Sequence, residues 1–97
     1  MEHAVVYLRQ RKGETTESLL SSADIYLSNV KNNYLIKDII FDSFMDRSQL
    51  DNFINTITKG FDVLIVDHYF EDEFDLNMIN EISRIENFRI KYFIRYG

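Results

Sequence analysis

The sequence of 97 residues contains no cysteine, no proline, no tryptophan and only three glycines. Without cysteine the chain has neither a disulfide framework nor a thiolate nucleophile. The scarcity of proline and glycine excludes a rigid linker and a glycine-rich phosphate loop. No apolar run approaches the roughly 18 residues of a membrane span, and the N-terminus lacks the basic and apolar regions of a signal peptide. These absences predict a cytoplasmic protein with no membrane contact and no cofactor.

The composition that remains is that of a folded protein. Hydrophobic residues make up 45% of the chain and aromatic residues 14%, which is enough to build one core. The net charge of −5 argues against direct binding to DNA, because DNA-binding surfaces are usually basic. With no internal repeat and no low-complexity tract, residues 1–97 are predicted to form a single domain.

The chain is organised around residues 60–73. A turn residue, Gly60, precedes the apolar run Val63 to Val66, and acidic residues follow it. A short β-branched run bounded in this way is typical of a central strand buried on both faces. In open α/β sheets, functional sites lie beyond the carboxyl ends of such strands, so any site is expected between Asp67 and Glu73.

The rest of the sequence alternates between strand and helix patterns. Apolar spacings of three and four predict helices, and short apolar or alternating runs predict strands. The predicted strands span 4–8, 34–41, 62–66 and 88–96, and the predicted helices span 16–32, 49–59 and 75–86. Thr15 or Thr16, Ser48 and Asp75 are the expected N-caps, and Asn87 ends the last helix. This order predicts a three-layer α/β fold, with a mostly parallel four-stranded sheet flanked by helices.

Several short motifs occur in this order along the chain. The first strand reads Tyr7-Leu8-Arg9-Gln10-Arg11. The second ends at Phe41-Asp42, and Asp46-Arg47 with Leu50 follows at a helix start. With the stretch Gly60 to Val66, these motifs resemble the N-terminal catalytic domain of the serine recombinases, the resolvases and invertases. The resemblance covers about residues 4–95 and implies the family fold.

The sequence departs from the family at the positions that carry its chemistry. The resemblance implies a serine that attacks a DNA phosphate and arginines that neutralise the developing charge. Arg11 stands at the serine position, and the acids of residues 71–73 stand where arginines are expected. Only Arg9, Asp42 and Arg47 remain from the family set. The interpretation is therefore a catalytically inactive protein, not an enzyme, that regulates DNA recombination for a phage or mobile element through protein contacts.

Two other interpretations stay open. The first is a recombinase fragment that cleaves DNA strands, with Ser43 or Ser48 as a displaced nucleophile. The second is a small module that binds an anion or nucleotide through Arg9, Arg11 and Arg47.

The acids after the predicted central strand are the expected partner-binding residues. A basic protein surface is the expected partner of Asp67, Glu71, Asp72 and Glu73. No spacing among them matches a cation motif, so no metal is expected. Asp67 and His68 would act as an acid–base pair only if the strand ends before them, because adjacent side chains of a strand face opposite ways. A homodimer through the aromatic residues Tyr92, Phe93 and Tyr96 is left open.

Overall fold

The computed structural model describes residues 1–56 and 60–96, which form four strands and three helices in strict alternation. The strands are β1 (Glu2–Arg9), β2 (Tyr34–Asp42), β3 (Val63–Val66) and β4 (Arg89–Tyr92). The helices are α1 (Thr16–Lys31), α2 (Ser48–Asn55) and α3 (Glu73–Glu86). All strand pairs are parallel, in the order β2-β1-β3-β4. The predicted α/β class and sheet are confirmed, while the predicted end of the second helix, residues 57–59, lies outside the described residues.

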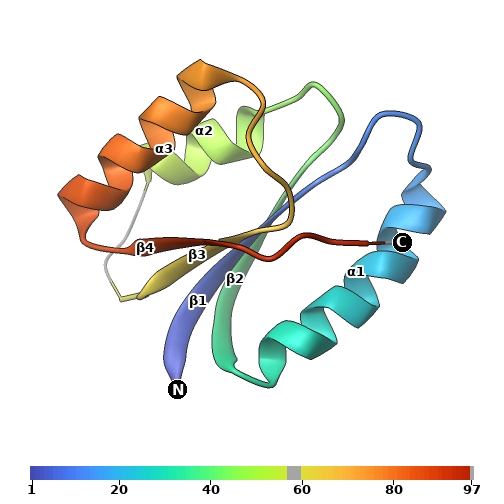
Figure 1. The fold of residues 1–97 in the computed structure, drawn as a ribbon, viewed down its shortest axis with the longest axis horizontal. Helices are drawn as coiled ribbons and strands as arrows, with labels where there is room; N and C mark the ends of the chain where they lie inside the picture. The colour runs from blue at the N-terminus through green and yellow to red at the C-terminus, as the bar shows by residue number, and fades with distance from the viewer. Residues whose placement is uncertain (57–59, 97) are drawn as a thin grey trace.

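The helices cover both faces of the sheet and give the three layers. Figure 1 shows α2 and α3 together on one face and α1 on the other. Each face of the sheet carries a hydrophobic core, and alternate residues of β1 pack into the two cores. Val5 and Tyr7 face α2 and α3, and Val6 and Leu8 face α1. All four residues of β3 are buried, which confirms the prediction of a central strand.

The parallel arrangement brings the carboxyl ends of the strands to one edge of the sheet. Arg9 ends β1 and lies opposite Asp42, which ends β2. Asp67 follows β3 directly, and its backbone N–H donates to the carbonyl of Tyr7. Sequence segments more than 20 residues apart thus place charged side chains side by side, as expected for an open α/β sheet.

The helix starts agree with the sequence at α1 and differ at α2 and α3. Ser48, the expected N-cap of α2, is instead its first residue, and Arg47 occupies the N-cap position without a side-chain capping hydrogen bond. Thr15 caps α1 as expected, and its side chain accepts a hydrogen bond from Ser18 N. The N-cap of α3 is Asp72 rather than Asp75, because the carboxylate of Asp72 accepts from Phe74 N. Asn87 ends the helix in a left-handed conformation, as predicted. Asp75 therefore lies inside the first turn, where its side chain points into the protein.

The last strand is shorter than predicted. β4 ends at Tyr92, and residues 93–96 continue as a tail along the end of β3. Backbone hydrogen bonds from Phe93 to Val66 and from Arg95 to Asp67 hold this tail in place. Within residues 1–56 and 60–96, no helix is long and apolar enough to cross a membrane.

Candidate functional site at the carboxyl edge of the sheet

Asp42 connects the end of β2 to the start of α2. Its carboxylate accepts hydrogen bonds from the backbone N–H groups of Gln49 at 2.9 Å and Leu50 at 3.0 Å. It also accepts from the hydroxyl of Tyr7 at 2.8 Å. Asp42 is buried, and the N-terminal end of a helix favours a negative charge. Asp42, which the sequence singled out, therefore caps α2 from the end of β2, the strand that precedes this helix.

Tyr7 links this aspartate to Arg9. The Nε and Nη2 groups of Arg9 donate to the Tyr7 hydroxyl at 3.0 and 2.7 Å. Burial, together with the hydrogen bond to Asp42, raises the pKa of Tyr7 well above its ordinary value. The hydroxyl therefore stays protonated and acts as a donor that positions Asp42, not as a nucleophile.

Asp75 brings two of the three predicted arginines together. Its carboxylate lies 2.5 Å from Nη1 of Arg47 and 3.9 Å from Nη1 of Arg9. The hydrogen bond to Asp75 raises the pKa of Arg47. The Arg47 guanidinium also lies 4.8 Å from the ring centre of Phe74, the residue before Asp75. The first turn of α3 thus contacts two of the three arginines of the candidate anion site, Arg9 and Arg47.

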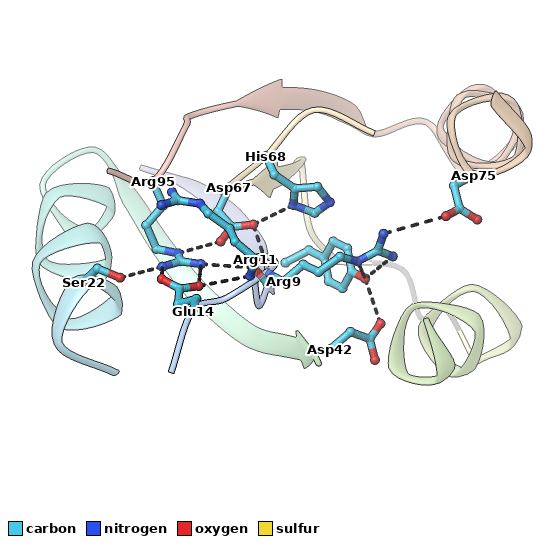
Figure 2. Close-up of polar contacts among 10 residues, drawn as sticks. Arg9, Arg11, Glu14, Ser22, Asp42, Asp67, His68, Asp75 and Arg95 are labelled. Carbon is cyan, nitrogen blue, oxygen red and sulfur yellow. Dashed lines mark hydrogen bonds and ion pairs between the residues drawn. The ribbon is translucent and has the colours of Figure 1, made fainter. Parts of the chain in front are cut away.

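A second network surrounds the buried side chain of Arg95. Figure 2 shows Arg95 between Asp67, Glu14 and Ser22, on the opposite side of Asp67 from Arg9 and Asp75. Arg95 donates to Asp67 at 2.7 Å, to Glu14 at 2.7 and 2.9 Å, and to Ser22 at 2.6 Å. Burial opposes the charge of Arg95, but the hydrogen bonds that it donates to Glu14 and Asp67 outweigh this effect and raise its pKa. The same pairing holds the pKa of Glu14 below its ordinary value.

Asp67 lies inside this network and not on the surface. It is 1% exposed, and it also accepts from the backbone N–H of Arg9 at 3.1 Å. Nδ1 of His68 lies 2.7 Å from its Oδ1. Because β3 ends at Val66, the two adjacent side chains are free to meet. The structure therefore removes Asp67 from the expected partner surface, since its charge is already neutralised by Arg95.

The remaining predicted residues occupy two separate places. Glu71, Asp72 and Glu73 are exposed, as a surface for a partner requires. Arg11 lines a hollow of about 480 Å³ together with Tyr69, Glu71 and Tyr96. Asp75 forms ion pairs with Arg9 and Arg47, whereas among the described residues no ion pair joins Asp75 to Arg11. The structure thus links Arg9 and Arg47 through one carboxylate, and Arg11 lines the hollow instead.

The buried carboxylates at this edge all have partners within the protein. Asp42 accepts from backbone N–H groups, and Asp67 and Asp75 accept from arginines. Among the described residues, no group of three or more His, Asp or Glu side chains is arranged to hold a metal ion. What this arrangement can do chemically is hold an anion beside arginines or present acids to a partner.

Sequence reasoning missed the roles of three residues in these networks. Tyr7 belonged to the first motif but had no assigned role, Asp75 was expected as a helix cap, and Arg95 was not singled out. Each forms a side-chain hydrogen bond with a partner at least 28 residues away in the sequence. One signal was available for Asp75, since the acid of a first helical turn lies near the carboxyl edge in this fold class.

The comparisons with known proteins identify the fold. No family model matches the chain, and no curated protein matches it in sequence. Among solved structures, the chain is similar to the C-terminal catalytic domain of ISC1926 TnpA, an IS607-like serine recombinase. The TM-score is 0.60 at 17% identity, over 95% of this chain and 68% of the other. The three-layer fold is therefore that of a serine recombinase catalytic domain.

This likeness corrects one prediction and leaves another unconfirmed. The prediction that the chain is not an enzyme, made from Arg11 at the serine position, is contradicted because the matched fold is that of a catalytic domain. The resemblance also pointed to an N-terminal catalytic domain, whereas in the matched protein the catalytic domain is C-terminal.

Proposed function

We propose that this protein functions in DNA recombination, and that it does so by presenting an acidic surface to a basic surface of a protein partner. The acidic surface consists of Glu71, Asp72 and Glu73, between β3 and the first turn of α3. The observation that supports it best is the combination of a serine recombinase fold with exposed acids at the edge where that fold carries its site.

The charges of this surface are available to a partner. In the described part of the chain, no ion pair engages Glu71, Asp72 or Glu73. Asp72 does have a structural task, because its side chain caps α3. Complementary charges steer association and fix orientation more than they add affinity. A basic partner would therefore bind faster at low ionic strength.

Charge reversal tests this proposal. The variant Glu71→Lys/Glu73→Lys keeps the Asp72 cap and changes the net charge by four units, from −5 to −1. The matched control, Glu17→Lys/Asp24→Lys, makes the same change at exposed positions on α1. Once a partner is recovered from the native host and purified, its association rate should fall with the first variant and change little with the control. Equal rates for the two variants would refute the proposal.

A second candidate function is the binding of a DNA phosphodiester by Arg9 and Arg47, with strand cleavage. The observation that favours it is that both arginines approach a single carboxylate, that of Asp75. Arginine binds carboxylate and phosphate with similar geometry. A nicked suicide substrate tests it, because a strand-transfer enzyme would become covalently joined to the DNA. Loss of that adduct in Ser43→Ala or Ser48→Ala would identify the nucleophile, and absence of an adduct in the unaltered protein would count against cleavage.

A further inference from the structure

Asp75 occupies an unusual position for a carboxylate in a first helical turn. Such acids are ordinarily solvated, whereas this side chain is 4% exposed and lies between two arginines from other elements. Arg9 comes from the end of β1, and Arg47 directly precedes α2. Asp75 therefore connects three elements through its charge, as the dashed line from Arg9 to Asp75 in Figure 2 partly shows.

The donors of Arg9 are already engaged in this arrangement. Nε and Nη2 donate to the hydroxyl of Tyr7, and Nη1 faces Asp75. Arg47 keeps more freedom, because its side chain is 40% exposed and only one of its nitrogens lies within hydrogen-bond distance of Asp75. An incoming oxyanion would therefore meet a site whose central position is filled by the protein's own carboxylate.

We propose that Asp75 is a built-in competitor that closes the oxyanion site of Arg9 and Arg47, and that a phosphate group binds by displacing it. This inference rests on the second candidate function. Displacement moves the first turn of α3, because Phe74 packs on the Arg47 guanidinium and Asp75 follows it in the same turn. The site is thus regulated by the position of one helical turn.

The charges around Arg47 provide a matched control. Asp51 also approaches Arg47, at 3.8 Å, but it is 45% exposed and lies one helical turn away on α2. Asp72 adds to the negative potential near Arg47. The substitutions Asp75→Asn and Asp51→Asn each remove one negative charge beside the same arginine. Only the first removes the charge of the group that lies between the two arginines, so general electrostatics and competition make different predictions.

The test is a titration with inorganic phosphate, followed by the backbone amide signals of the folded protein at constant ionic strength. Removing a competing charge-assisted hydrogen bond should tighten phosphate binding by Asp75→Asn at least about tenfold relative to wild type. Asp51→Asn should change it by less than about threefold. Adding Arg47→Gln to Asp75→Asn should abolish the gain.

The outcomes distinguish the competition by Asp75 from the oxyanion site of Arg9 and Arg47. Wild type, Asp75→Asn and Asp51→Asn could bind phosphate with equal affinity, and Arg47→Gln could abolish that binding. This result would overturn the competition by Asp75 but leave the oxyanion site supported. No binding by any folded variant would overturn both. Amide hydrogen exchange of Phe74 to Leu76 in the wild-type protein provides a second measurement that does not depend on the stability of Asp75→Asn. Faster exchange in phosphate than in chloride supports displacement, and unchanged or slower exchange overturns it.

Discussion

The Nε group of Arg95 donates a hydrogen bond of 2.7 Å to Oδ2 of Asp67, and neither side chain reaches solvent. This pair ties the C-terminal tail to the end of β3. The other guanidinium nitrogens donate to Glu14, Ser22 and the carbonyl of Arg9, so the buried charge is fully partnered. A buried ion pair of this kind adds little net stability, but breaking it leaves an uncompensated charge.

Replacing Arg95 with methionine should therefore destabilise the fold strongly. Arg95→Met leaves the buried Asp67 and the nearly buried Glu14 without their cation, and the expected loss of unfolding free energy is about 3–5 kcal/mol. Urea denaturation followed by circular dichroism measures this loss. Arg84→Met, at an exposed arginine on α3, serves as the control and should change stability by less than about 0.5 kcal/mol. Similar losses in both variants would contradict the assigned role of Arg95.

The same network should make stability depend on acid. The ordinary pKa of glutamic acid is 4.5, and the hydrogen bond from Arg95 lowers the pKa of Glu14 in the folded protein. The unfolded chain then binds more protons than the folded one as the pH falls, so the contribution of Glu14 is complete above pH 4.5 and is lost below it. Urea midpoints between pH 7 and pH 3 measure the effect. The Glu14→Gln variant should be less stable at neutral pH, and its urea midpoint should change less as the pH falls. The Glu17→Gln variant, altered at an exposed position, should show the wild-type dependence of the midpoint on pH.

Removing the hydroxyl of Tyr7 should break its hydrogen bonds to Asp42 and Arg9 without leaving a cavity in the core. Tyr7→Phe keeps the ring but removes a donor to Asp42 and an acceptor from Arg9. Leaving charged partners unsatisfied should cost about 1–3 kcal/mol of unfolding free energy. Tyr26→Phe is the matched control, because the Tyr26 hydroxyl is buried with no hydrogen-bond partner among the described residues. Thermal or urea unfolding of the two variants should therefore differ clearly, and equal stability would refute the proposed hydrogen-bond chain.

Asp42 should control the N-terminus of α2. Asp42→Ala removes the acceptor for two backbone N–H groups and for the Tyr7 hydroxyl, so a loss of at least about 1–2 kcal/mol is expected. Amide hydrogen exchange should show the loss first at Gln49 and Leu50. Asp46→Ala removes an exposed acceptor from the same helix end, Ser48 N, and should have a smaller effect. If α2 frayed equally in both variants, Asp42 would not be the principal cap.

The sequence was sufficient for the architecture because the relevant signals are local. The alternation of helical and strand periodicities predicts the element order, and the run Val63 to Val66 predicts the central strand. Thr15 and Asn87 were read as helix ends because capping depends on residues within one turn. The start of α3 was misplaced because two acids, Asp72 and Asp75, both suit an N-cap, and only packing shows which one turns inward.

The charged networks could not be predicted in the same way. Arg9 and Arg47 were singled out by family resemblance, but nothing local indicates that Asp75 lies between them. Asp67 was expected to face a partner, because acids are usually exposed, and nothing in the sequence singled out Arg95. These two residues pair because the parallel strands place their carboxyl ends at one edge of the sheet, which no local sequence pattern shows.

What the sequence by itself determined is the order of elements and the central strand, because hydrophobic periodicity and capping act over a few residues. What only the tertiary structure decided is which charges meet there. Arg95 neutralises Asp67 in the interior, Asp75 fills the space between Arg9 and Arg47, and Glu71 to Glu73 remain exposed. The physical reason is that a buried charge must find its partner in space, and these partners lie 28 or more residues away along the chain.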